Sequence, residues 1–529
     1  MKRMNAKRIA LLAATALAVL CGFMPAWGRE GALRPPKYVF IFIGDGTSFP
    51  QKNAAELYKA SAASPKDFEP AVLRAQNKIS RNTGITTFKP ASSRLVMNTF
   101  PVQGVSTTYS TNSLITDSSS SGTAIATGNK TRDGVVGMDA DARVKFTSIA
   151  KIAKAKGKKV GIITSVSIDH ATPASFYACQ PNRNDYYEIA VQASATGFDY
   201  FAGGGFKQTR GKKGDQKDVF DLFVESGYTI TRDRAGFDSL SRRDGKVVAL
   251  NPVLDADEAM PYTLDRSPGE ITLAEFVRKG IDLLDNDEGF FIMAEGGKVD
   301  WACHANDALS AILDVIAFDE AVEVAYEFYK RRPEDTLIVV TGDHETGGMA
   351  VGFAGTRYDT FLDRIGRQKG SYLAFNGILA DIKRDRPNLS LDDILPVVSD
   401  FFGLELHPAG EVELLKKAAA EGDAAAIEKL SFALQPFEVD TIRKGLETTL
   451  IPPKKRPENE DAYFKDYGNY EPLTVALTHV LNNKAGIGWT TFSHTGLPSP
   501  VSAVGAGSEM FIGYYDNTDI FKKIMSIAY

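Results

Sequence analysis

The stretch YVFIFIGDG, residues 38–46, is a continuous apolar run that ends in a carboxylate between two glycines. Four further short apolar runs follow it along the chain, at residues 160–165, 247–250, 290–294 and 336–341. None of them alternates between apolar and polar residues, which is typical of parallel strands buried on both faces. Helical patterns lie between the runs, for example at residues 147–156 and 308–331. This alternation predicts an α/β sandwich, in which ligands bind beyond the carboxyl ends of the strands.

Composition limits the class of protein. The chain has 529 residues, of which 43% are hydrophobic and 24% are charged, and it has only three cysteines. These values exclude a disordered chain and a disulfide-knotted one. The formal net charge of -5, with no basic block inside the chain, argues against a nucleic-acid partner. Outside the N-terminal region, Cys179 and Cys303 could form one disulfide in an oxidising compartment, although the sequence does not show that they meet.

The N-terminus is predicted to be a secretory signal peptide, residues 1–28. Basic residues precede the apolar stretch 9–23, and the small residues Ala26 and Gly28 offer a cleavage site after Gly28. An uncleaved membrane anchor is the alternative, but the apolar run is shorter than the ~20 residues that a span needs. A lipoprotein is disfavoured, because a bulky leucine precedes Cys21. We therefore expect a mature chain, residues 29–529, that is exported to the periplasm or the extracellular space and has no membrane partner.

Residues 356–483 differ in composition from the rest of the mature chain. They are rich in Ala, Lys, Glu and Leu, most clearly at 411–434, and they close with a charged, proline-containing segment at 452–461. A usual domain size of about 150 residues would give roughly three domains, but large α/β enzymes often form one continuous sheet. We interpret residues 356–483 as a mostly helical insertion in one catalytic domain, serving as a lid, a dimer contact or a packing module.

Polar residues follow the predicted strands. Asp45 stands on a tight turn where glycine lets the backbone approach a ligand closely, although an Asp-Gly turn alone is commonplace. Asp343 and His344 come directly after the last run, where they place two metal-binding groups at the open edge of the sheet. His494 lies in a loop near the C-terminus. It is a candidate metal ligand only in combination with the other metal-binding residues. Two further histidines belong to no such constellation with carboxylates and are assigned to structure: His407 and His479.

The strongest local signal is the motif Glu295-(x)4-Asp300-(x)3-His304. Residues four apart share one face of a helix, so Asp300 and His304 can hold one metal ion between them. An ion pair on a solvated helix is the structural alternative. Glu295 ends the predicted strand and is placed for a second metal site, whereas Cys303 points to another helical face and is not counted as a ligand.

Two segments of the sequence are suited to binding an anion. Ser118 begins a serine run before a small-residue helical stretch, and a helix N-terminus offers amide donors and a positive dipole end to an anion and its nucleophile. A plain N-cap is the alternative. Further on, the hydroxyl of Thr172 can ligate a hard cation. Arg183 can grip two phosphate oxygens in a fork, or it can be an ordinary surface residue.

Taken together and in this order, these segments resemble the alkaline phosphatase family. The match consists of a strand-end Asp, an Asp-Ser segment, His-Ala-Thr-Pro followed by an Arg, the Glu-Asp-His motif, an Asp-His pair and a late His. It covers about residues 38–353 and 485–520. The resemblance implies a three-layer α/β/α sandwich with a largely parallel central sheet plus the helical insertion, and it implies a homodimer.

The resemblance also implies a secreted enzyme that hydrolyses phosphate monoesters through a phosphoserine on Ser118, with Arg183 binding the phosphate. Two zinc ions would each be held by three residues: Asp300, His304 and His494 for one, and Asp45, Asp343 and His344 for the other. A third ion, usually magnesium, would be held by Asp45, Thr172 and Glu295. One zinc ion would lower the pKa of the serine hydroxyl, and the other would accept the leaving-group oxygen and then activate water.

The chain departs from the family pattern at three places. Thr47-Ser48 stands where the family more often has Met-Gly, beside an intact strand-end aspartate. His170 and Trp301 occupy positions that vary among members and tune phosphate release and the third ion. The interval between His344 and His494 is longer than in compact members, and it contains the predicted helical insertion.

Two other functions are alternatives to a phosphomonoesterase. A phosphodiesterase or sulfatase of the same superfamily typically lacks the third metal site and the phosphate-binding arginine, whereas Glu295 and Arg183 are both present. A non-catalytic protein that binds metal or phosphate would be expected to have lost a ligand or the nucleophile, and none is missing. The sequence therefore favours phosphate monoesters as substrates.

Overall fold

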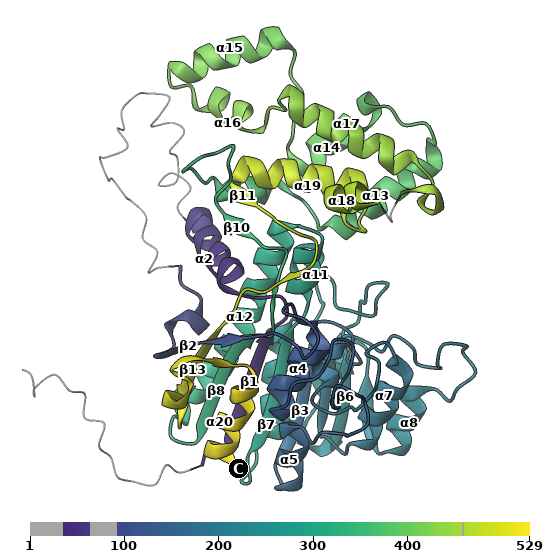
Figure 1. Ribbon diagram of the computed structural model, residues 1–529, viewed down its shortest axis with the longest axis vertical. Helices are drawn as coiled ribbons and strands as arrows, with labels where there is room; N and C mark the ends of the chain where they lie inside the picture. Colours follow the sequence, from purple (N-terminus) through teal and green to yellow (C-terminus); the bar gives the residue numbers. More distant parts are fainter. Residues whose placement is uncertain (1–34, 64–92, 458–459) are drawn as a thin grey trace, which may run out of the picture. The chain divides into compact units, whose positions relative to one another are not determined.

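The computed structural model describes residues 35–63, 93–457 and 460–529. The predicted signal peptide, residues 1–28, lies outside these ranges. A ten-stranded sheet runs through the described chain (Figure 1). In sheet order its strands are β14 (Gly513–Asp516), β2 (Val102–Thr107), β13 (Ser499–Gly505), β8 (Thr336–Gly342), β1 (Tyr38–Gly44), β7 (Phe290–Gly296), β3 (Lys159–Thr164), β4 (Tyr200–Gly203), β6 (Lys246–Leu250) and β5 (Tyr228–Thr231). Strand β13 is antiparallel to both of its neighbours, and the other pairings are parallel.

All five apolar runs found in the sequence are strands of this sheet. Every residue of β1, β7 and β8 is buried, as expected for strands covered on both faces. Strand β1 pairs with β7 and β8 in a register that sets Gly44 level with Gly296 and Gly342. The three strands therefore end at one edge, and the residues that follow them are brought together.

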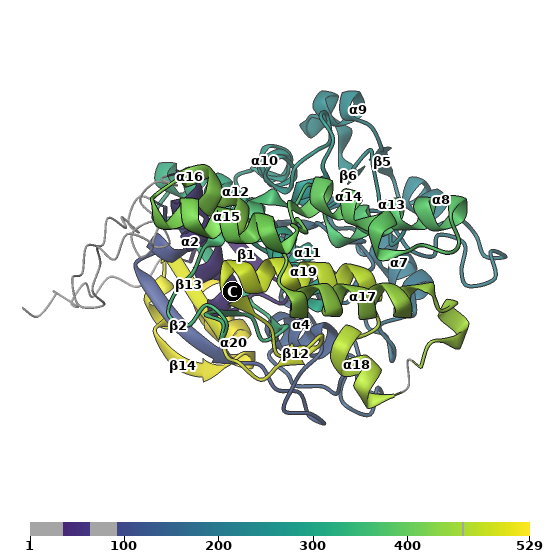
Figure 2. The ribbon, with the colours of Figure 1, turned by 90° about the horizontal axis from the view of Figure 1, so that it is seen from above.

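Helices form a layer on each side of the sheet (Figure 2). Phe40 and Phe42 of β1 belong to one hydrophobic core, and the alternating residues Ile41 and Ile43 belong to the other. The first core is shared with α2 (Phe49–Ala63), α10 (Leu273–Leu284) and α12 (Ala308–Arg331). The second core is shared with α4 (Ser118–Thr127), α5 (Ile149–Ala155), α7 (Tyr186–Ala195), α8 (Val219–Glu225) and α20 (Thr518–Ala528). The predicted three-layer α/β/α sandwich with a largely parallel sheet is confirmed.

Residues 356–483 are mostly helical, as predicted, and the helices stand above the sheet in Figure 1. They are α13 (Tyr372–Asp385), α14 (Leu391–Phe402), α15 (Ala409–Ala420), α16 (Ala424–Phe432), α17 (Pro436–Leu450), α18 (Asp461–Tyr467) and α19 (Pro472–Ala485). Leu473, Leu477 and Leu481 of α19 lie in the same core as α12, so this helical segment packs on the sheet domain through shared apolar contacts. Its role as a lid, a dimer contact or a packing module stays a prediction.

The two cysteines of the described chain are free and buried. Cys179 packs with Val135 and Met138 in a small cluster. Cys303 lies in the main core, where its sulfur is 3.9 Å from Nε2 of Gln51. The disulfide considered from the sequence is therefore absent, because the two thiols lie in different apolar clusters. In the same described ranges, no helix has the length and apolar character that a membrane span requires.

The close approach of β8 to the loop after β1 predicts that Gly342 cannot be replaced. A Cβ atom at Gly342 would lie 1.8 Å from the carbonyl oxygen of Thr47, so Gly342→Ala must displace the backbone beside Asp45. We expect the free energy of unfolding to fall by about 1–3 kcal/mol or more, measured by urea denaturation. The matched control is Gly377→Ala, which meets nothing within 4 Å on α13 and should stabilise the chain slightly. Equal midpoints for Gly342→Ala and the unmodified chain would contradict this account of the strand ends.

Candidate metal and phosphate site

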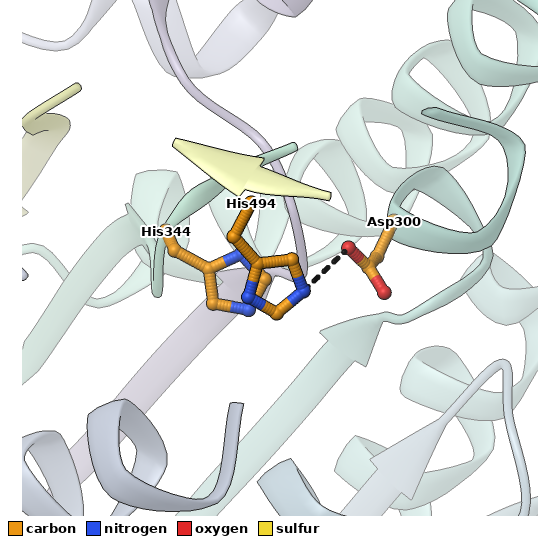
Figure 3. Close-up of side chains that lie close together, drawn as sticks. All are labelled: Asp300, His344 and His494. Carbon is orange, nitrogen blue, oxygen red and sulfur yellow. Dashed lines mark ion pairs between the residues drawn. The ribbon is translucent and has the colours of Figure 1, made fainter. Parts of the chain in front are cut away.

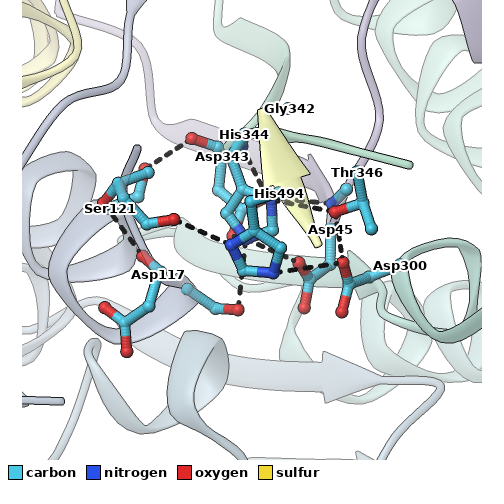
Figure 4. A network of polar contacts seen from close by, with 12 residues as sticks. Asp45, Asp117, Ser121, Asp300, Gly342, Asp343, His344, Thr346 and His494 are labelled. Carbon is cyan, nitrogen blue, oxygen red and sulfur yellow. Dashed lines mark hydrogen bonds and ion pairs between the residues drawn. The ribbon is translucent and has the colours of Figure 1, made fainter. Parts of the chain in front are cut away.

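The polar residues that follow β1, β7 and β8 converge on one buried region (Figure 4). Asp45 follows β1, Asp343 follows β8, and Glu295 is the penultimate residue of β7. All three carboxylates are completely buried. Parallel strands in this register leave no other position for them, so the sheet itself holds three acidic groups close together.

One cluster joins Asp300, His344 and His494, whose ligand atoms lie within 4.8 Å of one another (Figure 3). Asp300 and His304 lie on α11 (Lys298–His304), with His304 Nε2 at 3.4 Å from Asp300 Oδ2. Nε2 of His494 lies 3.6 Å from Asp300 Oδ1 and 3.1 Å from Nε2 of His304. Two ring nitrogens and a carboxylate that meet in this way form a donor set suited to a divalent metal.

A second cluster joins Asp45, Asp343 and His344. Nε2 of His344 lies 3.3 Å from Asp45 Oδ1 and 3.3 Å from Asp343 Oδ2. Neither carboxylate oxygen of Asp45 has a hydrogen-bond partner, and the same is true of Oδ2 of Asp343. Buried carboxylate oxygens without donors are costly, so these atoms fit a bound cation.

A third cluster joins Asp45, His170 and Glu295. Thr172, which was predicted as a ligand here, is buried on α6 (Ala171–Ala174), and its hydroxyl oxygen has no hydrogen-bond partner. His170 immediately precedes α6 and makes an edge contact with Trp301, with ring centroids 5.8 Å apart. His170 and Trp301, the pair singled out by the family resemblance, are thus in contact beside this cluster.

Burial and mutual repulsion act on the carboxylates. Burial raises the pKa of Asp45 well above its usual range, and the neighbouring carboxylates add to the shift. Burial also raises the pKa of Asp343, where Asp300 and Glu295 reinforce it, and it raises the pKa of Glu295 to about 7. Without a cation, the region disfavours full ionisation of these groups, so a metal ion that binds here competes with protons.

The histidines of the site lower the pKa of Asp300, and their own pKa values shift in different directions. Burial alone would raise the pKa of Asp300, but His304, His494 and His344 hold it well below its usual range. Burial and the adjacent imidazoles lower the pKa of His344, and burial lowers that of His494. Burial would also lower the pKa of His304, but the Asp300 carboxylate raises it above its usual value. Neutral imidazoles at His344 and His494 are the form that ligates a metal.

Backbone carbonyls orient two of these rings. Nδ1 of His304 lies 2.6 Å from the carbonyl oxygen of Phe492, and Nδ1 of His494 lies 2.7 Å from that of Thr116. Each Nδ1–H donates to its carbonyl, so both Nε2 atoms face the cluster with a free lone pair. His494 lies on β12 (His494–Thr495), which pairs with β9 (Glu345–Thr346) directly after His344.

Ser118 is the first residue of α4, and its Oγ lies 3.2 Å from Nε2 of His344. Asp117 caps the helix by accepting a hydrogen bond from the Ser120 amide at 2.9 Å. The serine is 1% exposed, beside the first and second clusters. Its position brings the amide end of a helix to the metal-binding region, which favours an anion there.

Arg183 lies beside this helix end rather than free on the surface. Its Nη1 donates to Asp117 Oδ2 at 2.9 Å, and its Nη2 lies 3.4 Å from Nε2 of His170. Burial would raise the pKa of Asp117, but Arg183 and the serine donors hold it well below its usual range. The Arg183–Asp117 pair was not identified from the sequence, although an aspartate before a serine-initiated helix is a recognisable N-cap signal.

Asn306 is a further residue that the sequence did not reveal. It has a positive φ of 52°, is 1% exposed, and its Nδ2 donates to the carbonyls of Cys303 at 2.8 Å and Thr491 at 3.0 Å. Its Oδ1 lies 2.9 Å from Nε2 of His479, whose ring stacks on Phe492 at 5.8 Å. Asn306 thus ties the end of α11 to the loop that orients His304 and carries His494.

The assignment of the two remaining histidines needs one correction. Burial lowers the pKa of His479 to about 4, so it is a neutral packing residue, as predicted. His407, in contrast, was expected to belong to no constellation with carboxylates, and this is wrong. Its Nε2 lies 3.1 Å from Glu405 and its Nδ1 lies 3.3 Å from Glu411, because α15 begins just after it and turns Glu411 back toward the ring.

Comparisons with known proteins agree with this geometry. A family model described as alkaline phosphatase matches residues 70–529. Alkaline phosphatase 3 of Bacillus subtilis is 29% identical over 418 residues, which cover 78% of this chain and 76% of that protein. The cold-active alkaline phosphatase of a psychrophilic Shewanella species is 25% identical with a TM-score of 0.67, covering 93% of this chain and all of that one. A mutant of the TAB5 alkaline phosphatase with Mg bound in the M3 site is 25% identical with a TM-score of 0.56, covering 94% and 99%.

The contacts of Asn306 predict its effect on stability. In Asn306→Asp, Oδ1 can still face His479, but the side chain can no longer donate to the carbonyls of Cys303 and Thr491. We expect the free energy of unfolding in urea to fall by about 1–3 kcal/mol, because two buried acceptors lose their donor. His479→Gln, which can still donate to Asn306, is the matched control and should lose less. If Asn306→Asp were as stable as the unmodified chain, Asn306 would not fix this loop.

Proposed function

The chain belongs to the alkaline phosphatase family and is a phosphatase, and from that premise we propose that it hydrolyses phosphate monoesters through a phosphoserine on Ser118. The observation that carries this proposal is the contact of Ser118 Oγ with Nε2 of His344 at 3.2 Å, at the amide end of α4. A hydroxyl held there has a helix dipole on one side and metal-binding groups on the other.

The donor atoms of this region support two zinc ions. The first cluster contains His344, and His304 stands beside it, with its Nε2 at 3.4 Å from Asp300 Oδ2 and 3.1 Å from Nε2 of His494. We propose one zinc ion at Asp300, His304 and His494, and a second at Asp45, Asp343 and His344. Mixed carboxylate and imidazole sets of this kind are typical of zinc, and the unpartnered oxygens of Asp45 and Asp343 support a cation beside them.

A third ion is proposed at Asp45, Thr172 and Glu295, which together offer only oxygen atoms. Oxygen sets suit magnesium, and the unpartnered hydroxyl of Thr172 supports a role as ligand. His170 also lies within this cluster, and an imidazole suits zinc and other transition metals better than magnesium. We assign magnesium to this site, with His170 held outside the ligand set by Arg183, whose Nη2 lies 3.4 Å from Nε2 of His170.

In the proposed reaction, residues of this chain have separate roles. Bound divalent ions would supply Lewis acidity that lowers the pKa of the serine hydroxyl and neutralises developing charge. Ser118 Oγ attacks phosphorus in line, forms the new P–O bond, and the alcohol leaves. Arg183 is held by Asp117 through one terminal nitrogen, which leaves donors of its guanidinium for the phosphate oxygens. Water then attacks the phosphoserine, which releases inorganic phosphate and restores the hydroxyl.

We further propose that the protein is exported, with residues 1–28 as its signal peptide, and that it forms a homodimer. The basic and apolar pattern of those residues supports export. Periplasmic or extracellular zinc and magnesium would then fill the metal sites. The dimer rests on the family resemblance.

Replacing the nucleophile gives the most direct test. Ser118→Ala should lower kcat for a chromogenic phosphate monoester by about 10³-fold or more, because no covalent intermediate can form. Acid quenching with a ³²P-labelled substrate should label the unmodified enzyme and leave the variant unlabelled. Ser239→Ala, an exposed serine on α9 (Arg234–Ser239), is the matched control and should keep full activity. Unchanged turnover in Ser118→Ala would refute the nucleophile assignment, and a preference for a diester or sulfate ester would refute the substrate class.

Metal removal tests the three ion sites. A chelator should abolish monoesterase activity, and zinc should restore it, with two zinc ions per chain by elemental analysis. Glu295→Ala should keep both zinc ions and lose the additional stimulation by magnesium, because only the third site loses its strand-end carboxylate. Zinc content below two in Glu295→Ala, with magnesium stimulation intact, would show that this carboxylate belongs to a zinc site instead.

A further inference from the structure

The helical segment and the chain just before it form an open cavity of about 570 Å³ that none of the proposed catalytic residues lines. Its walls come from α16, α17 and α19, together with the chain around residues 353–356. A volume of this size is in the range of small-molecule sites in proteins. The cavity is a separate feature of the molecule, and the reaction proposed above gives it no role.

One part of the cavity wall is apolar. Ile427 and Leu430 line it from α16, Phe437 from α17 and Val480 from α19, and Phe353 adds an aromatic ring. Phe437 is 69% exposed, although Val439, Ile442 and Leu446 on the same helix are buried. A large exposed aromatic side chain at the wall of a cavity favours contact with a hydrocarbon ligand.

Another part of the wall carries Arg364, a cation that has no ion-pair partner in the described chain. Nη1 of Arg364 donates to the carbonyl oxygen of Lys484 at 2.8 Å, and Nη2 donates to Ser431 Oγ at 3.1 Å. Its guanidinium carbon lies 3.8 Å from the ring centroid of Phe361. Among the described residues, no carboxylate forms an ion pair with Arg364. Burial lowers the pKa of Arg364 to about 10, and the carboxylate of the adjacent Asp363 offsets only part of this effect. A largely buried guanidinium bonded only to neutral groups is energetically costly.

The other titratable residues of the cavity wall do not form an ion pair with Arg364. Lys484 also lines the cavity, but its Nζ is paired with Glu438 at 2.7 Å, and both side chains are 9% exposed. Glu438 also accepts a hydrogen bond from the Gln435 amide at the start of α17. His479 is neutral, because burial lowers its pKa to about 4. Among the residues that line the cavity, Arg364 is therefore the charged group that has no ion-pair partner.

We propose that this cavity binds an organic carboxylate with an apolar body, its carboxylate on Arg364 and its hydrocarbon part against Leu430 and Phe437. A guanidinium has five N–H donors, and the two hydrogen bonds of Arg364 leave the others for a carboxylate fork. One free positive charge matches a monoanion, whereas a phosphate dianion would need further donors. The apolar wall excludes a small hydrated anion as the preferred ligand.

Calorimetric titration of the full-length protein with decanoate tests the proposal. Decanoate should bind with one site per chain, and decanol, which has the same chain without the charge, should bind at least about tenfold more weakly. Arg364→Gln should weaken decanoate binding by about tenfold or more, and Arg364→Lys should weaken it less. Arg443→Gln on α17, which breaks an exposed pair with Asp440, is the matched control and should bind as the unmodified chain does.

A second variant keeps the test decisive if Arg364→Gln does not fold. Thr441 lines the cavity from an exposed position, so Thr441→Trp should fill it and abolish decanoate binding while hydrolysis of a phosphate monoester continues. Absence of decanoate binding at about 1 mM would overturn the proposal. Equal affinity for decanol, or decanoate binding unaffected by both Arg364→Gln and Thr441→Trp, would also overturn it. These outcomes are independent of monoesterase activity, which reports on the proposed function alone.

Discussion

The repulsion among Asp45, Glu295 and Asp343 is the constraint on which the site depends. The parallel register of β1 with β7 and β8 brings these three carboxylates to one edge of the sheet, where all are buried. Hydrophobic burial of the strands drives the carboxylates together, and the site lacks enough protein cations to neutralise them. The fold thus provides the energy that creates affinity for divalent ions, and the surrounding imidazoles complete the donor sets.

The elements that the sequence predicted well share one property, which is burial on both faces. Continuous apolar runs marked β1, β3, β6, β7 and β8, and the four-residue spacing of Asp300 and His304 placed both on one face of α11. Shorter or alternating strands gave no such signal. Strand β2 alternates buried and more exposed residues, and β4 and β5 have only four residues each, so neither group was identified.

The residues that the sequence missed depend on tertiary contacts. Asp117 and Arg183 are 66 positions apart, and only the folded chain brings the guanidinium to the carboxylate at the start of α4. Asn306 gave no motif, because its importance lies in a positive φ and in donors to two distant carbonyls. His407 is a different case, because both of its carboxylate partners are close in the sequence: Glu405 lies two residues before it and Glu411 lies four residues after it. Spacing along a sequence reveals partners on one helix but not partners across loops.

The contact of His479 with Asn306 and Phe492 has a consequence for protein engineering. His479 belongs to the helical segment, whereas Asn306 and Phe492 belong to the chain that orients His304. A chimera that received residues 356–483 from a relative would separate these interacting partners. Such an exchange has to carry compatible residues at all three positions, so the helical segment and the catalytic scaffold are inherited as one unit rather than as interchangeable modules.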